Sequence, residues 1–145
     1  MSSITADVST LRDLRSFAKK LQTNLPKGAV VALVGPLGAG KTTLVQEVAR
    51  LIGILSPVQS PTYTLLKTYR DEEGAVRLNH VDAYRANDED AHHVLEECFS
   101  CPEALCMVEW ADRIANAIPD SAVWVRIEPT KKDQRIATIF SGRPS

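Results

Sequence analysis

A glycine-rich stretch in the first third of the chain has the residue types needed to hold a polyphosphate. Residues 35–42 read GPLGAGKT, which fits the phosphate-loop (P-loop) pattern GxxxxGK[ST]. The glycines let successive backbone N–H groups turn inward around phosphate oxygens, and the positive end of the following helix adds to the attraction. In this pattern Lys41 bridges the β- and γ-phosphates, and the Thr42 hydroxyl coordinates Mg²⁺. The alternative is a glycine-rich turn that joins a strand to a helix and binds no ligand. Such a turn does not explain all four fixed residue types.

Two acidic residues are candidates for holding Mg²⁺ or its water. Glu109 follows four apolar residues, and a carboxylate buried there without a cation would be costly, which favours a role facing a metal. Asp82 closes another apparent strand, and the alternation predicts that His80, Asp82 and Tyr84 share one face. A simpler role for Asp82, pairing with Arg85 or capping a turn, stays open.

A loop with two prolines, residues 56–62, comes soon after the P-loop and supplies another candidate. In P-loop switch proteins a loop in this place carries a threonine that senses the γ-phosphate and Mg²⁺, which makes Thr62 a candidate. A structural role, with its hydroxyl capping the turn, is equally compatible. Trp110, directly after Glu109, either packs against the site or fills the core, and the core is the simpler interpretation.

Charge and cysteine content narrow the class of protein. Seventeen basic and eighteen acidic residues leave a net charge of −1, so we expect any RNA connection to run through a partner. The one basic cluster between the last two predicted strands is interpreted first as a solvated turn and second as a contact to a nucleotide or partner. It consists of Lys131, Lys132 and Arg135.

Three cysteines, an odd number, predict free thiols in a reducing cytosol. Cys98, Cys101 and Cys106 follow His93, but their spacing matches no familiar zinc motif. The N-terminus has neither the basic region nor the apolar core of an export signal. Since no apolar run approaches the ~18 residues that span a bilayer, we expect a cytoplasmic protein without a membrane segment.

These side chains need a scaffold of alternating strands and helices. The continuous apolar run 29–34 predicts a strand buried on both faces, as parallel sheets require, and a helix over 43–52 follows the P-loop. Other predicted helices cover 11–25, 89–99 and, more briefly, 111–117, and other predicted strands cover 4–8, the hairpin 63–70 and 75–82, 105–109, 123–128 and 136–140. We expect a single α/β domain over residues 1–145, a P-loop NTPase-like three-layer fold with a mixed, partly antiparallel sheet flanked by helices.

The order of the motifs resembles that of the TsaE family, also called YjeE. The matching stretches are GPLGAGKTT at 35–43, SPTY at 60–63, HVDAYR at 80–85 and VEW at 108–110. The last two are far more specific than the P-loop, and the resemblance covers nearly the whole chain. It implies a small bacterial ATPase that supports threonylcarbamoyladenosine (t6A) formation on tRNA. It also implies that the protein acts with the TsaB–TsaD pair and meets tRNA only through that complex.

The resemblance also implies roles for individual residues. ATP hydrolysis would depend on Lys41, Thr62, Asp82 and Glu109, with Thr42 and Glu109 nearest to Mg²⁺. Residues near the start of the first helix would approach the base. The full nucleotide-binding set expected here is Ser9, Thr10, Leu37, Gly38, Ala39, Gly40, Lys41, Thr42, Thr43 and Trp110.

Two positions depart from the family pattern. An acidic residue commonly follows the first glycine of the loop, and here it is Pro36. We expect nucleotide binding to survive, because the N–H groups that touch phosphate come from later in the loop. The usual glycine of the first helix is also absent, with Phe17 and Ala18 near that place.

Three other functions compete with an ATPase. A small-molecule kinase would need an acceptor pocket and a basic lid, for which 145 residues leave little room. A GTP-dependent switch would normally carry an Asn-Lys-x-Asp stretch, which does not occur. The third is a scaffold with a vestigial P-loop, whose assembly with partners would not depend on Lys41.

Overall fold

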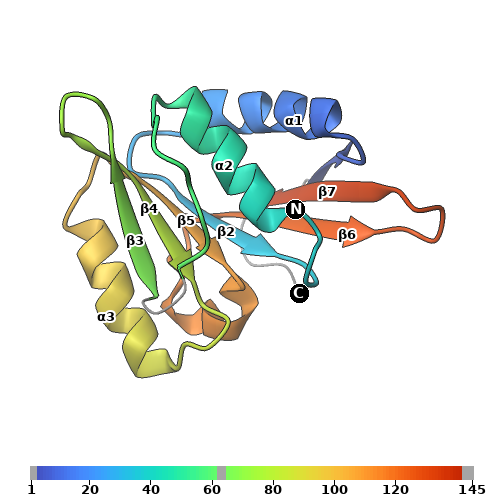
Figure 1. The fold of residues 1–145 in the computed structure, drawn as a ribbon. Helices are drawn as coiled ribbons and strands as arrows, with labels where there is room; N and C mark the ends of the chain where they lie inside the picture. The colour runs from blue at the N-terminus through green and yellow to red at the C-terminus, as the bar shows by residue number, and fades with distance from the viewer. Residues whose placement is uncertain (1–2, 62–64, 142–145) are drawn as a thin grey trace.

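A computed structural model of the chain describes residues 3–61 and 65–141. Within them lies a mixed seven-stranded sheet with the order β1-β7-β6-β2-β5-β4-β3 (Figure 1). Strands β6, β2, β5 and β4 are mutually parallel, and the outer pairs β1–β7, β7–β6 and β4–β3 are antiparallel. The strands are β1 (Ser3–Asp7), β2 (Val30–Val34), β3 (Leu66–Arg70), β4 (Val76–Asp82), β5 (Leu105–Glu109), β6 (Val123–Pro129) and β7 (Arg135–Ser141).

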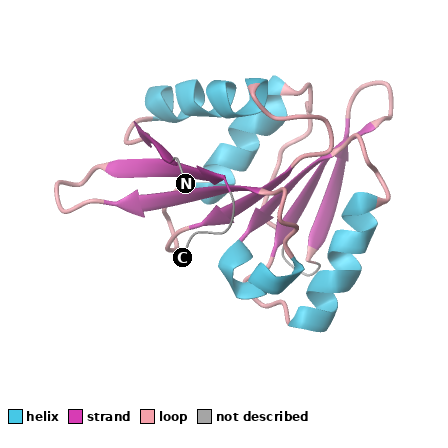
Figure 2. Cartoon of the chain, turned by 180° about the vertical axis from the view of Figure 1, so that it is seen from behind, coloured by secondary structure: helices cyan, strands magenta, loops and turns pink. Residues whose placement is uncertain are grey.

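Helices cover both faces of this sheet. Helices α1 (Leu11–Thr23) and α2 (Lys41–Leu51) lie on one face, and α3 (Asp88–Phe99) and the 3₁₀ helix η1 (Ala111–Ala117) lie on the other (Figures 1 and 2). The predicted three-layer α/β arrangement with a mixed sheet is therefore confirmed.

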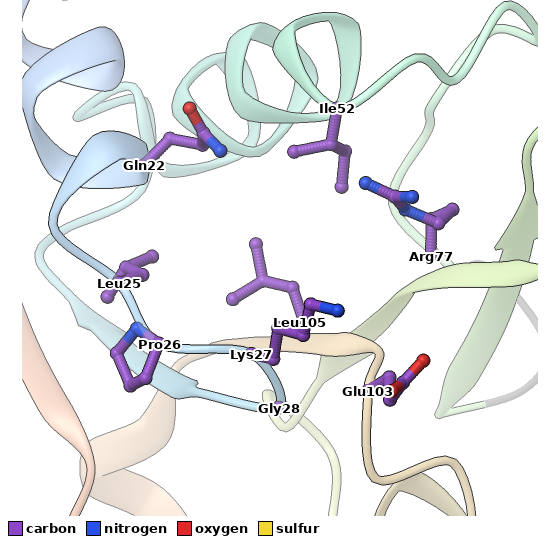
Figure 3. A pocket seen from close by; sticks show the side chains of 9 residues that line it. All are labelled: Gln22, Leu25, Pro26, Lys27, Gly28, Ile52, Arg77, Glu103 and Leu105. Carbon is purple, nitrogen blue, oxygen red and sulfur yellow. The ribbon is translucent and has the colours of Figure 1, made fainter.

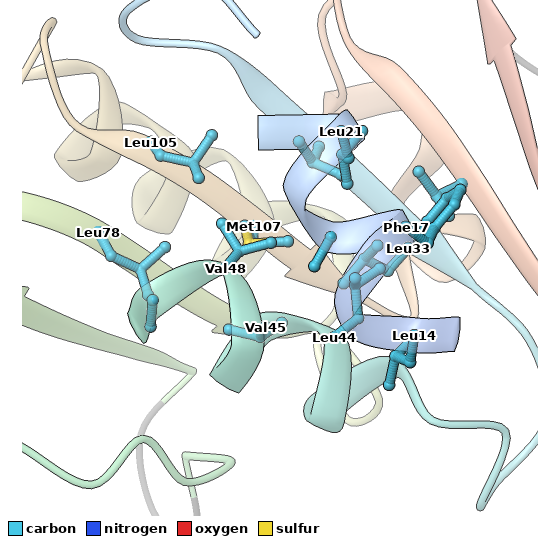
Figure 4. Packing of buried hydrophobic residues seen from close by; sticks show 14 of the residues in the cluster. Leu14, Phe17, Leu21, Leu33, Leu44, Val45, Val48, Leu78, Leu105 and Met107 are labelled. Atoms are coloured by element: carbon cyan, nitrogen blue, oxygen red, sulfur yellow. The ribbon is translucent and has the colours of Figure 1, made fainter. Parts of the chain in front are cut away.

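The burial of β2 explains its continuous apolar sequence. All five of its residues are buried, since Val31 and Leu33 pack under α1 and α2 while Ala32 packs on the other face. Figure 4 shows the first cluster, in which side chains of α1 and α2 meet those of the strands. The labelled members are Leu14, Phe17, Leu21, Leu33, Leu44, Val45, Val48, Leu78, Leu105 and Met107.

Several element ends differ from the predictions. The first helix ends at Thr23, with Asn24 as its C-cap, instead of running to residue 25. Helix α2 begins at Lys41, two residues earlier than predicted, since the last loop glycine serves as its N-cap. The segment over 111–117 is a helix of 3₁₀ type with a kink at Ile114. Strand β4 ends at Asp82, so Tyr84 lies beyond it.

Among the residues described, no helix has the length and apolar character needed to cross a membrane.

Candidate functional site

The P-loop joins the end of β2 to the start of α2, at the carboxyl end of the parallel strands (Figure 1). Its path requires glycine, because Gly35 has φ +148° and a Cβ there would lie 2.3 Å from the Ile127 carbonyl oxygen. Gly40 has φ +109° and caps α2. The first turn of α2 therefore presents backbone N–H groups that have no carbonyl partner within the helix. This is the local geometry that binds anions.

A cleft of about 420 Å³ opens over the loop. It brings together residues from five separate parts of the chain: the loop and the start of α2, the segment before residue 61, the end of β4, the end of β5, and the start of β7. Its lining is Leu37, Gly38, Ala39, Gly40, Lys41, Thr42, Thr43, Ser60, Asp82, Glu109, Trp110 and Arg135.

The Lys41 ammonium lies inside this cleft. The side chain is buried, and its Nζ donates to the carbonyl oxygens of Gly35 and, at 3.1 Å, Pro36. Nζ also lies 3.8 Å from the centre of the Trp110 ring. The half-buried Trp110 ring therefore does both things considered for it, since it packs against the hydrophobic cluster on the α3 face of the sheet and also lies against the loop lysine. Burial lowers the pKa of Lys41, against the raising effect of the Glu109 carboxylate.

The Glu109 carboxylate is the centre of a buried hydrogen-bond network. The Thr42 hydroxyl lies 2.8 and 2.9 Å from its two oxygens and 3.0 Å from the Ser60 hydroxyl. His80, which is fully buried, places Nε2 2.6 Å from Glu109 Oε2. His80 Nδ1 has no partner among the described residues. A proton on Nε2 is therefore the tautomer that leaves no buried N–H without an acceptor.

Asp82 lies beside this network. It pairs in register with Glu109 across the parallel strands β4 and β5, so both carboxylates face the same side of the sheet. Its Oδ1 accepts the backbone N–H of Tyr84 at 3.0 Å, as the turn-capping role requires. The predicted shared face is confirmed for His80 and Asp82. Tyr84 instead packs edge-on against Trp110, with ring centres 4.9 Å apart.

The oxygen atoms in the cleft have the chemistry of a magnesium site. Thr42 contributes a hydroxyl, and Glu109 and Asp82 contribute carboxylates from adjacent strands. Hard oxygen donors of this kind are what Mg²⁺ prefers, and it is usually held by one or two carboxylates together with substrate phosphates. The residues therefore fit Mg²⁺.

Comparisons with known proteins match this chain over nearly its whole length. The family model described as "Threonylcarbamoyl adenosine biosynthesis protein TsaE" matches residues 8–137. The chain belongs to the TsaE family. Its fold is similar to the crystal structure of YdiB from Bacillus subtilis, with a TM-score of 0.77 and 30% identity over 95% of this chain and 84% of the other. This likeness confirms the predicted P-loop-type fold.

Relatives named for the same family share about a third of their residues with this chain. The TsaE protein of Bacillus subtilis (strain 168) is 36% identical over 87% of this chain and 78% of its own length. The TsaE protein of Mycobacterium tuberculosis (strain H37Rv) is 34% identical over 96% and 88%.

Two residues expected near the base in a TsaE protein, Ser9 and Thr10, are not part of the cleft lining. The Thr10 hydroxyl caps α1 by accepting the N–H of Asp13 at 3.1 Å. Ser9 Oγ donates to Asp7 Oδ1 at 2.5 Å, and this bond lowers the pKa of the Asp7 carboxyl. Neither residue lines the cleft, but Ser9 Oγ also accepts the N–H of Arg135, which does. Thr62 lies outside the described residues.

The cysteines stand apart from the cleft. Cys98, Cys101 and Cys106 are free thiols. Cys98 and Cys106 share a hydrogen bond, which lowers the pKa of Cys98 and, with burial, raises that of Cys106. Within the described residues no three His, Cys, Asp or Glu side chains are grouped so as to hold a metal ion, which leaves the zinc interpretation without support.

The structure adds two lining residues to the set predicted for the cleft, Ser60 and Arg135, and one buried residue, His80, that supports Glu109 without lining the cleft. Ser60 lines it beside Thr42, and His80 holds Glu109 from below. Arg135 enters from the β6–β7 hairpin. Its basic cluster was visible in the sequence, but only the pairing of β7 with β1 and β6 brings this one residue to the loop.

Proposed function

We propose that this chain is a P-loop ATPase that supports t6A formation on tRNA, with residues 1–145 acting as one domain. The observation that carries the proposal is the convergence of the loop lysine, its threonine and a strand-end carboxylate in one cleft. The chain belongs to a family named for threonylcarbamoyl adenosine biosynthesis, and this membership supports t6A formation as the process in which the ATPase acts. A cytoplasmic location forms part of the proposal.

Binding of ATP rests on groups that are already aligned. Loop N–H groups from Leu37 to Thr43 surround the phosphates, and Lys41 leaves the carbonyls of Gly35 and Pro36 to bridge the β- and γ-phosphates. Thr42 and Glu109, whose side chains are hydrogen-bonded to each other, would hold Mg²⁺. The ion, when bound, neutralises the charge on the β- and γ-oxygens that hydrolysis increases.

The two carboxylates have different tasks in this proposal. Both Glu109 oxygens accept a hydrogen bond from the Thr42 hydroxyl, and one of them is also bonded to His80. We therefore assign Glu109 to the binding of the metal. Asp82 is half-buried and lines the cleft, and among the described residues the one hydrogen bond of its carboxylate runs from the Tyr84 N–H to Oδ1. We assign to Asp82 the orientation of the attacking water. As the water oxygen bonds to the γ-phosphorus, the leaving ADP takes the electron pair of the broken P–O bond, and the proton of the water passes to an oxygen of the phosphate.

Thr62 stays a prediction as the sensor of the γ-phosphate. Ser60, two residues before it, lies 3.0 Å from the Thr42 hydroxyl, which supports a role for this loop at the metal side of the cleft.

Partners complete the proposed activity. Hydrolysis is slow in the isolated protein and accelerates with TsaB and TsaD, and tRNA is met only through that complex. The formal net charge of −1 agrees with an indirect connection to RNA.

The test is phosphate release from Mg–ATP by the purified protein, alone and with TsaB and TsaD, for wild type and Glu109→Ala. We expect Glu109→Ala to lower turnover about 100-fold while ATP affinity changes by only a few-fold, because metal positioning acts mainly in the transition state. Undiminished turnover in Glu109→Ala would remove this residue from the mechanism.

Further arms of the same assay separate the competing functions. A GTP affinity above that for ATP would favour a GTP switch, and ADP release that requires a small acceptor would favour a kinase. Normal complex assembly together with unchanged t6A formation in Lys41→Ala would favour a scaffold.

A further inference from the structure

A single arginine reaches the P-loop from the side opposite the acids. Arg135 is the first residue of β7, its side chain is exposed, and it lines the cleft. A Cβ placed on Gly40 would lie 3.7 Å from Arg135 Nη1. The guanidinium therefore lies next to the last loop residue before Lys41.

The backbone of Arg135 is fixed on both sides. Its N–H donates to Ser9 Oγ at 2.9 Å, its carbonyl accepts the N–H of Val8 at 2.9 Å, and it pairs with Pro129 of β6. Within residues 3–61 and 65–141, no carboxylate lies within ion-pair distance of its guanidinium. A cation with an anchored backbone and no acidic partner faces the anion-binding loop.

Strand order separates Arg135 from the proposed metal side. Strands β5 and β4, which end in Glu109 and Asp82, lie on one side of β2, and β6 and β7 lie on the other. The β6–β7 hairpin extends past the P-loop (Figures 1 and 2). If Thr42 and Glu109 hold Mg²⁺ at the β- and γ-phosphates, the α-phosphate is the anionic group left for the Arg135 side of the loop.

We propose that Arg135 binds the α-phosphate of the nucleotide. This inference rests on the proposed nucleotide site and adds a residue to it. The planar guanidinium can donate two parallel N–H bonds to phosphate oxygens, which are stronger than neutral hydrogen bonds. Since ATP and ADP both carry this phosphate, Arg135 contributes equally to the affinity of both and does not sense the γ-phosphate.

The neighbouring lysine offers a matched control. Lys132 is exposed in the turn between β6 and β7, carries the same charge and does not line the cleft. Removing it tests whether the general positive charge of the hairpin, instead of one directed contact, attracts the nucleotide.

The experiment is calorimetric titration of the wild-type protein, Arg135→Ala, Arg135→Lys and Lys132→Ala with Mg–ADP and with a non-hydrolysable Mg–ATP analogue. We expect Arg135→Ala to weaken both nucleotides about 10-fold, Arg135→Lys to recover part of the loss, and Lys132→Ala to stay within about 2-fold, since one charge-assisted contact is at stake. Unchanged thermal unfolding of Arg135→Ala confirms that this exposed residue acts on the ligand.

Three results would overturn the inference. They are unchanged affinities in Arg135→Ala, an equal loss in Lys132→Ala, and a loss confined to the ATP analogue, which would place the guanidinium at the γ-phosphate. A wild-type protein that binds neither nucleotide is a different result, because it would overturn the proposed function itself.

Discussion

The two ends of the parallel strands carry pockets with similar residues and different construction. At the carboxyl end, Lys41 and Glu109 line the cleft over the P-loop. At the amino end, a smaller pocket of about 110 Å³ is lined by Lys27, Glu103 and Arg77 among others (Figure 3). Each pocket combines a lysine, a glutamate, glycine and apolar side chains. Residue types therefore do not distinguish the two.

Burial does distinguish them. Lys41 and Glu109 are 5% and 4% exposed, whereas Lys27 and Glu103 are exposed to solvent. Burying a charge is costly unless it is bonded, and the carboxyl-end charges are bonded to loop carbonyls, a hydroxyl and an imidazole. Structures that hold desolvated charges together in a cleft are candidates for function. Exposed charges around a shallow pocket carry no such cost.

The amino end has a structural role instead. Gly28 has φ +73°, and a Cβ there would lie 2.0 Å from the carbonyl oxygen of Pro102. The turn before β2 and the turn before β5 are therefore in direct backbone contact. This close approach sets the relative start of two central strands.

The largest expected effect is on nucleotide affinity, and it should separate the lysines of the two pockets, Lys41 and Lys27. Lys41→Ala should weaken Mg–ATP binding about 1,000-fold, since two charge-assisted bonds of about 2 kcal/mol each are lost. Lys27→Ala, the matched change at the amino end, should leave the affinity unchanged. Calorimetric titration of both variants measures the difference, and equal effects would abolish the distinction between the ends.

A glycine substitution should reveal the structural role of the amino end. Gly28→Ala should lower the free energy of unfolding by about 2–3 kcal/mol, because backbone must move and φ is positive. Gly74→Ala is the control, with φ +86° but nothing within 4 Å of the added Cβ, and should cost about 1 kcal/mol. Urea denaturation measures both. A smaller loss in Gly28→Ala than in Gly74→Ala would contradict the role of the close contact.

The smallest expected effect is on turnover, and it comes from substitution of His80, which is hydrogen-bonded to Glu109. His80→Ala should lower turnover about 10-fold with nucleotide affinity nearly kept, since a lost positioning bond of about 1.4 kcal/mol acts on the reaction step. His80→Gln, which restores a donor, should recover part of the rate. Asn79→Ala is the control, because Asn79 is the buried polar neighbour and bonds Thr68 on the adjacent strand. Phosphate release under saturating ATP measures all three. Full activity in His80→Ala would show that Glu109 needs no support.

The predicted elements were most accurate where burial alone determines the pattern. Residues 105–109 were predicted as a strand with the bounds that β5 has, because both faces are covered. The predicted hairpin was likewise confirmed in β3 and β4. Helix ends were less accurate, since capping by Gly40 and Asn24 depends on local backbone angles that periodicity does not contain.

The site residues that belong to sequence motifs could be predicted. Lys41, Thr42, Asp82 and Glu109 were named from residue type and strand position, and the structure places all four in one cleft. The bond between His80 and Glu109 joins residues 29 apart and depends on the register of β4 on β5. The approach of Arg135 to Gly40 depends on sheet order. Neither relation leaves a local signal in the sequence.

The most direct test is to find where the nucleotide binds. Backbone amide spectra of ¹⁵N-labelled protein titrated with Mg–ATP should show saturable shifts for residues 37–43 and for the Trp110 indole. The amides of Lys27, Gly28 and Leu105 at the opposite end should stay in place. Shifts confined to the amino-end pocket, or none in the P-loop at saturating ATP, would contradict the claim that the carboxyl end of the sheet is the nucleotide site.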